Sequence, residues 1–143
     1  MNSFSNRKPT KSFILTLSIG LFIVSLFQQC FCTSFGCAYS IAVLFSGSFA
    51  FYLCNAGLVW LANPLLLISW IQFNKNHKFS LITSFVAMII SLSFLFFSKI
   101  IDNEAGVYSA ILSYKLGYWL WLSSSLTMFI GNGIMMLGGL SSG

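Results

Sequence analysis

The chain has 143 residues, of which 57% are hydrophobic and 17% aromatic, while only 6% are charged. A soluble domain carries roughly 25% charged residues, so this composition excludes an ordinary soluble protein and predicts an integral membrane protein. A chain of this length holds about four helices of roughly 20 residues, which leaves no room for a second, soluble domain. We assign the formal net charge of +5 to contact with anionic lipid and predict no binding of nucleic acid.

Long apolar blocks divide the chain. Four of them contain no Lys, Arg, Asp or Glu: residues 13–27, 40–73, 79–98 and 116–137. The second block would reach about 51 Å as one straight helix, whereas the hydrocarbon core of a membrane is about 30 Å thick. One straight spanning helix therefore cannot account for the whole second block.

Basic residues predict the direction in which the chain crosses the membrane. Arg7, Lys8 and Lys11 precede the first block, and Lys75 and Lys78 lie between the second and the third. Cytoplasmic segments carry an excess of Lys and Arg, so we place both segments in the cytoplasm. The number of crossings between them must then be even, which favours a single span in the second block.

The predicted fold is an all-α membrane protein, a four-transmembrane-helix bundle that forms one integral membrane domain over residues 1–143. Its spans cover about residues 13–29, 56–73, 79–99 and 115–137, and both termini are cytoplasmic. The apolar segment of about residues 40–54 is predicted to remain outside as a short interfacial or re-entrant helix. The alternative for this segment is one long helix bent at Asn63 and Pro64. The predicted location is the bacterial inner (plasma) membrane.

The first block has a second interpretation as a cleaved secretory signal. It has a basic start and an apolar stretch of about 15 residues, followed by Cys30 and Cys32. Gln28 and Gln29 give a poor cleavage context, so we favour an uncleaved first span.

Small residues mark the faces on which the spans are expected to pack. Apolar burial gives no advantage inside apolar lipid, so close backbone approach at small residues guides helix contacts. At helical spacing, the predicted packing positions are Ser80, Ser84, Ala87 and Ser91 in the third span, and Gly117, Ser124 and Gly131 in the fourth.

All four cysteines map to the outer half of the predicted topology. They are Cys30, Cys32, Cys37 and Cys54. In an oxidising compartment such a group predicts structural disulfides. Cys30 and Cys32 are too close in sequence to pair together without strain, so each is expected to pair with Cys37 or Cys54.

Four spans, an apolar outer segment and four cysteines resemble the DsbB-type disulfide-generating membrane proteins in outline. The resemblance implies quinone-linked thiol oxidation by the outer cysteines. The sequence departs from that family in two ways, because its motif is Cys30-Phe31-Cys32 instead of Cys-x-x-Cys, and because residues 101–115 contain no cysteine. The departures leave no evident relay of electrons between the two outer loops.

No metal and no cofactor are predicted. Three neighbouring thiolates suit copper(I) or zinc, and Met128, Met135 and Met136 would add thioethers. These methionines lie about 20 Å or more along the fourth span from the cysteines, and Met is common in apolar packing.

The sequence also shows no arrangement of residues that would catalyse hydrolysis. His77 lies in a short basic loop without a neighbouring carboxylate and is predicted to be solvated. Both acids of the chain, Asp102 and Glu104, lie in the predicted second outer loop, which we interpret as a partner-contact loop. We expect no enzymatic activity.

Three further stretches resemble uncharacterised small bacterial inner-membrane proteins, over about residues 30–125. They are WLANPLL at residues 60–66, IDNEAG at 101–106 and GYWLWLS at 117–123. This resemblance implies no particular function.

The predicted function is that of a small multi-pass accessory or interaction subunit without catalytic activity. Its expected partners are the lipid bilayer and another membrane protein. The alternatives are a DsbB-like thiol-disulfide oxidoreductase and a small-solute transporter or channel.

Overall fold

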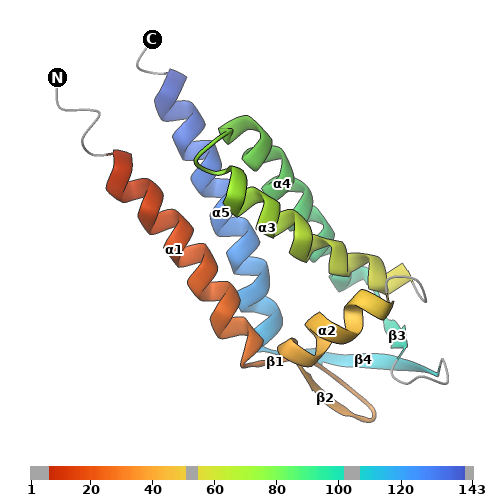
Figure 1. Ribbon diagram of the computed structural model, residues 1–143. Coiled ribbons are helices and arrows are strands. Elements are labelled where there is room, and N and C mark those ends of the chain that lie inside the picture. Colours follow the sequence, from red (N-terminus) through yellow and green to blue (C-terminus); the bar gives the residue numbers. More distant parts are fainter. Residues whose placement is uncertain (1–6, 51–54, 102–106, 141–143) are drawn as a thin grey trace.

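The computed structural model describes residues 7–50, 55–101 and 107–140. Within them, four helices form a bundle, and a small sheet with one further helix lies at one end of the bundle (Figure 1). The bundle helices are α1 (Arg7–Leu26), α3 (Ala62–Gln72), α4 (His77–Ser93) and α5 (Leu116–Leu140). The further helix is α2 (Ser40–Ala50). We call this end of the bundle the sheet end.

At the opposite end of the bundle, the first helix begins and the last helix ends. The start of α1, the end of α5 and the turn between α3 and α4 all lie there (Figure 1). Lys11 and Lys78 are therefore close to the same end, and Lys11 Nζ lies 2.9 Å from His77 Nε2. We call it the basic end.

Four strands form the sheet. They are β1 (Gln29–Thr33), β2 (Gly36–Tyr39), β3 (Lys99–Ile101) and β4 (Tyr108–Tyr114), in the spatial order β2-β1-β4-β3 with every neighbouring pair antiparallel. The pairing of β1 with β4 joins the segment after α1 to the segment before α5. The amide of Lys115 extends this pairing by donating to the carbonyl of Cys30 at 2.8 Å.

The β1–β2 hairpin closes through a turn that requires glycine. Gly36 has φ +146°, a conformation that side-chain-bearing residues rarely adopt. The Thr33 hydroxyl accepts a hydrogen bond from the amide of Phe35 and donates one to the carbonyl of Gly36, both at 3.3 Å. The turn thus places Cys32 opposite Cys37.

Short 3-10 segments adjoin two of the bundle helices. Segment η1 (Asn55–Leu61) runs directly into α3, and η2 (Phe94–Phe96) follows α4. Pro64 lies in the first turn of α3, where helix amides have no partner within the helix, so proline is tolerated there. Helix α4 begins at a cap in which the Asn76 side chain accepts the amide of Phe79 at 3.2 Å.

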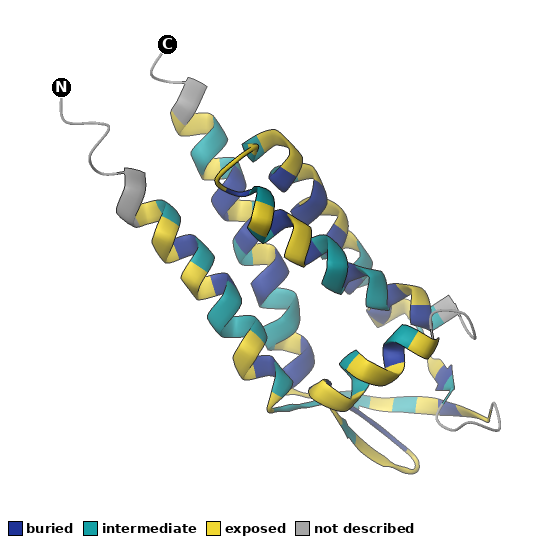
Figure 2. Cartoon of the chain, in the orientation of Figure 1, coloured by how far each residue is buried: buried dark blue, intermediate teal, exposed yellow. Residues whose placement is uncertain are grey.

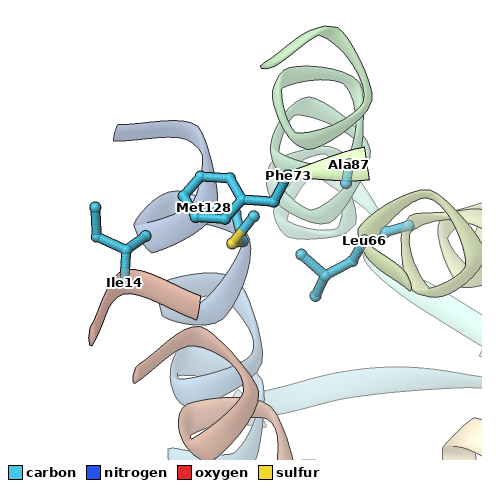
Figure 3. Packing of buried hydrophobic residues seen from close by; sticks show 6 residues of the cluster. Ile14, Leu66, Phe73, Ala87 and Met128 are labelled. Atoms are coloured by element: carbon cyan, nitrogen blue, oxygen red, sulfur yellow. The ribbon is translucent and has the colours of Figure 1, made fainter. Parts of the chain in front are cut away.

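The apolar core of the bundle takes residues from each of its four helices. Figure 3 shows Ile14 of α1, Leu66 of α3, Ala87 of α4 and Met128 of α5 turned toward one another, with Phe73 beside them. Leu66, Phe73, Ala87 and Met128 are fully buried. A second cluster at the sheet end contains Phe31, Phe94 and Tyr118 and links the strands to the bundle.

Hydroxyl groups connect the helices through the same interior. The Ser18 and Ser124 hydroxyls each donate to the other residue's carbonyl, at 2.9 and 2.8 Å, which ties α1 to α5. Trp70 Nε1 of α3 donates to Ser18 Oγ at 2.9 Å. Ser69 and Ser80 form an equivalent reciprocal pair between α3 and α4, at 3.0 and 2.8 Å.

The predicted four-transmembrane-helix bundle is wrong. In the part of the chain that the structure describes, only residues 77–96 and 116–138 form helices long and apolar enough to cross a membrane. The apolar stretches of the other helices, residues 10–26 and 56–72, have 17 residues each, fewer than the roughly 20 that a spanning helix needs. Sequence blocks without charges overestimated the helical length, since their ends form strands, turns and 3-10 segments.

The prediction of an all-α fold is wrong for the same reason. The predicted first span ends at about residue 29, and residues 108–114 were expected in an outer loop, whereas residues 29–33 and 108–114 are paired strands. The two strands form because segments about 80 residues apart hydrogen-bond to each other. A local apolar pattern cannot predict such a long-range pairing.

The close contact between α1 and α5 leads to a testable prediction. A Cβ atom at Gly131 would overlap the buried Ile14 side chain, whereas a Cβ atom at Gly133 meets nothing within 4 Å. We expect Gly131→Ala to lower the free energy of unfolding by about 1–3 kcal/mol, because overpacking forces the two helices apart. Gly133→Ala is the matched control and is expected to be neutral or stabilising by up to about 1 kcal/mol through helix propensity. Denaturant titration of both variants checks this, and equal effects would contradict the contact.

Candidate functional site

A cavity of about 560 Å³ lies at the sheet end of the bundle. Its walls come from the end of α1, the β1–β2 hairpin, α2, η1 and the sheet-end parts of α3 and α5. Pockets for small molecules usually measure about 300–1,000 Å³, so this cavity has the size of a ligand site.

The cavity wall is apolar and aromatic. The rings on it are Phe22, Phe31, Phe49, Trp60, Phe94 and Trp121. No Lys, Arg, His, Asp or Glu is among the described residues that line it. A charged ligand would therefore find no counterion on this wall, and an uncharged one suits it.

Asn63 and Trp121 hold the cavity wall on the side of the bundle. Trp121 Nε1 donates to Asn63 Oδ1 at 2.9 Å, and Asn63 Nδ2 donates to the carbonyl of Trp60 at 3.1 Å. The oxygen and the nitrogen of the Asn63 amide are thus both hydrogen-bonded within the chain. The sequence analysis identified Asn63 as a group at a bend and missed Trp121, because their positions are 58 residues apart.

Helix α2 closes the cavity by packing on η1. Trp60 Nε1 donates to the carbonyl of Leu44 at 2.7 Å. A Cβ atom at Gly47 would lie 2.5 Å from Trp60 Cδ1, so glycine permits the indole ring to lie against the helix. The exposed positions Ala42 and Ser46 also line the cavity, which places its opening along this face of α2.

The described cysteines occupy two different environments. Cys32 and Cys37 form a disulfide across the hairpin, so the prediction of a disulfide is confirmed. Cys30 carries a free, buried thiol on the cavity wall, so the prediction that it forms a disulfide is wrong. Cys54 lies outside the described residues.

Burial makes Cys30 a poor nucleophile. It raises the pKa of the Cys30 thiol from 9.0 to about 11, and a hydrogen bond with the Ser40 side chain offsets part of this effect. At neutral pH the thiol is therefore almost entirely protonated. The folded state favours the neutral thiol, so this contribution to stability is complete below pH 9 and is lost as the pH rises toward 11.

Ser40 lines the cavity, and its hydroxyl lies beside Cys30 and Gly117. The Ser40 side chain is 8% exposed. Its main chain is fixed by the amide, which donates to the carbonyl of Gln28 at 2.9 Å. The hydroxyl is enclosed beside the Cys30 thiol and is not open to a ligand in the cavity.

The four small residues predicted as a packing face of the third span are all buried in α4. Ser80 contacts Ser69 of α3, and Ser84 Oγ accepts a long hydrogen bond of 3.4 Å from Asn132. Ser91 offers its carbonyl to the Tyr118 hydroxyl at 3.0 Å. Ala87 belongs to the apolar core.

The three positions predicted in the fourth span lie at contacts along α5. Gly117 faces Ser40 and the carbonyls of residues 28 and 29, where any side chain would overlap them. Ser124 bonds to Ser18, and Gly131 faces Ile14. None of these three positions lines the cavity, although Gly117 contacts Ser40, which does.

The remaining predicted residues lie away from the cavity. Asp102 and Glu104 lie outside the described residues. His77 is partly buried against Phe73 and accepts a hydrogen bond from Lys11. Met128 is fully buried in the apolar core. No group of three His, Cys, Asp or Glu suited to a metal ion occurs among the residues described.

The raised pKa of Cys30 predicts slow alkylation. At pH 8 the thiolate fraction of Cys30 is expected to be about 100-fold smaller than in the unfolded chain, because each pKa unit is tenfold. Iodoacetamide should therefore modify Cys30 at least that much more slowly in the folded protein, with a rate that rises up to about pH 11. Peptide mass spectrometry measures the rate, and the same chain unfolded in dodecyl sulfate is the control. Equal rates in both states would contradict the buried, neutral thiol.

Comparison with known proteins finds no relative of this chain. No protein family, no curated protein and no solved structure matches this chain. The functional conclusions therefore depend on the chain's own residues and geometry.

Proposed function

We propose that the protein is an integral membrane protein that acts as an accessory or interaction subunit without catalytic activity. The observation that carries this proposal is an inverted polarity of the bundle, in which hydroxyl groups are buried inside and large apolar side chains are exposed outside. Its fully buried side chains include the hydroxyls of Ser18, Ser69, Ser80, Ser84, Ser91 and Ser124. The exposed side chains of α4 and α5 are large and apolar, among them Ile82, Ile89, Ile130, Ile134 and Leu137.

Lipid is the solvent in which such a polarity is favourable. In water, a continuous exposed apolar surface of this extent promotes association, whereas in a bilayer it contacts acyl chains. Helices in lipid associate through small residues and hydrogen bonds, and the reciprocal serine pairs of the bundle are contacts of this type. Figure 2 shows exposed positions along the outer faces of the helices and buried positions along the inner ones.

The basic end supports a cytoplasmic orientation for the two termini. Lys11, Lys75 and Lys78 belong to this end, where the turn between α3 and α4 lies beside the start of α1. Basic residues next to a span favour the cytoplasmic side of the membrane. In this orientation the sheet, α2 and the disulfide lie on the opposite side, which is the oxidising side of a bacterial inner membrane.

The polar groups of the described residues are better suited to binding than to catalysis. The Cys30 thiol is neutral at pH 7, and the imidazole of His77 has Lys11 and no carboxylate as its partner. General acid-base catalysis needs a titratable group that is oriented by a partner and reaches a substrate. The groups in the described part of the chain do not form such a pair.

A lysine placed on the exposed face of α5 distinguishes lipid from water. Leu126 is 41% exposed near the middle of the helix, and Leu116 is 58% exposed at its start. Leu126→Lys is expected to reduce the membrane-integrated fraction strongly, because lysine at the centre of a span costs about 2.5–3.5 kcal/mol. Leu116→Lys is the matched control and should be tolerated, since its amine reaches the interface. Alkaline carbonate extraction measures the fraction. A wild-type chain that is released as a soluble protein, with Leu126→Lys improving its yield, would contradict the proposal.

Purification in a mild detergent tests the accessory role. A membrane protein that co-purifies in a fixed ratio and is lost after disruption of the sheet end by Gly36→Val would support it. A chain that is isolated alone, even after cross-linking in intact membranes, contradicts the role of an interaction subunit.

A further inference from the structure

The single histidine of the chain joins α1 to α4 at the basic end. His77 is the first residue of α4, and its Nε2 atom lies 2.9 Å from Nζ of Lys11 in α1. The two helices pack mainly on other partners, since α1 lies along α5, and α4 lies along α3 and α5. The contact between Lys11 and His77 therefore holds the start of α1 to the start of α4, where the α3–α4 turn ends (Figure 1).

This contact requires a neutral imidazole. A lysine ammonium has three donors and no acceptor, so Nε2 of His77 has to accept the hydrogen bond, and the ring proton has to be on Nδ1. The Nδ1 atom is buried and has no hydrogen-bond partner among the described residues. The ring of Phe73 lies edge-to-face against the imidazole, with the two centroids 5.6 Å apart, and helps to fix its orientation. A second proton on the imidazole would occupy Nε2 and remove the acceptor.

The charged side chains at the basic end all have the same sign. Residues 7–50, 55–101 and 107–140 contain no Asp or Glu, and neither α3 nor α5 contains a Lys, Arg or His. The start of α4 adds the partial positive charge of a helix N-terminus. A protonated imidazole would therefore have no counterion here, and two cations 2.9 Å apart repel each other strongly. The basic residues of the elements at this end are Arg7, Lys8 and Lys11 of α1, Lys75 of the turn and Lys78 of α4.

We propose that the contact between Lys11 and His77 is a pH-sensitive switch, which holds the start of α1 against α4 while the imidazole is neutral and releases it when the imidazole is protonated. The hydrogen bond is present at high pH and is lost as the pH falls, and an ordinary imidazole takes up its proton at about pH 6.5. The Ser18–Ser124 contact continues to hold α1 to α5, so the movement is confined to the first turns of α1. The switch goes beyond the proposed function, because an accessory subunit does not require a pH-dependent contact.

Nuclear magnetic resonance of the imidazole nitrogens tests the contact itself. Because His77 is the single histidine, nitrogen-15 histidine labelling of the full chain, purified in detergent through a tag without histidine, gives one pair of ring signals. We expect the tautomer with the proton on Nδ1 at pH 8 and the doubly protonated ring at pH 4.5. Lys11→Met removes the ammonium and should shift the tautomer at pH 8 toward the proton on Nε2. A wild-type ring with its proton on Nε2 at pH 8, or a tautomer that Lys11→Met leaves unchanged, would overturn the contact.

Spin labels at two exposed positions, Ser12→Cys in α1 and Asn74→Cys in the turn, test the release. The four native cysteines are replaced by serine, and pulsed electron paramagnetic resonance measures the distance between the labels. We expect one narrow distance at pH 8 and a longer, broader distribution at pH 4.5. His77→Gln is the matched control, because its amide oxygen accepts from Lys11 without titrating, and it should keep the narrow distance at both pH values. Each variant is first checked for wild-type helicity and elution volume.

The outcomes distinguish the switch from the proposed function. A label distance that is the same at pH 8 and pH 4.5 would overturn the switch and still agree with a membrane-embedded accessory subunit. An equal change in the wild-type background and in His77→Gln would also overturn it, because a group other than the imidazole would then cause the movement. A change that occurs in the wild-type background and is absent in His77→Gln supports the switch, whether or not carbonate releases the chain from membranes.

Discussion

The reciprocal contact between Ser18 and Ser124 is the interaction on which the arrangement of the bundle depends. Each hydroxyl donates to the other residue's carbonyl, and Trp70 Nε1 donates to Ser18 Oγ, so α1, α3 and α5 meet at one point. Such a contact requires close backbones, which Gly131 permits where α5 faces Ile14. The same principle joins α3 to α4 through Ser69 and Ser80. In lipid, where apolar burial between helices contributes little, such contacts specify which helix faces meet.

The sheet end follows from this arrangement. Because α1 and α5 are held together, the chain leaving α1 and the chain entering α5 emerge side by side, and β1 pairs with β4. The sheet then contacts the bundle through aromatic rings, and the Tyr114 hydroxyl donates to the carbonyl of Phe94 at 3.1 Å. Helix α2 lies across this junction without filling it, since its residue Leu44 is held by Trp60 of η1. The cavity is the space left between the bundle, the hairpin and α2.

Local patterns in the sequence predicted part of this molecule. The apolar blocks located the bundle helices, and the clustering of the cysteines correctly predicted a disulfide, formed by Cys32 and Cys37. The number of spans was wrong because residues without charge were counted as helix, although their ends form strands and 3-10 segments. The strand at residues 108–114 could not be predicted from alternation, because its buried position is Ser109 whereas the apolar residues Ala110 and Leu112 are exposed. The cavity could not be predicted, because the bond of Trp121 to Asn63 joins positions far apart in the chain.

Disulfide trapping between α1 and α5 tests the central contact most directly. Ser18 Oγ and Ser124 Oγ are 3.0 Å apart, so cysteines at the two positions have nearly the separation that a disulfide requires. The double variant Ser18→Cys and Ser124→Cys, in a chain whose four native cysteines are replaced by serine, is predicted to form an intramolecular disulfide almost completely under mild oxidation, while Thr16→Cys with Ser124→Cys does not. Absence of a bridge between positions 18 and 124, or equal yields for both pairs, would contradict the account of how these helices are held together.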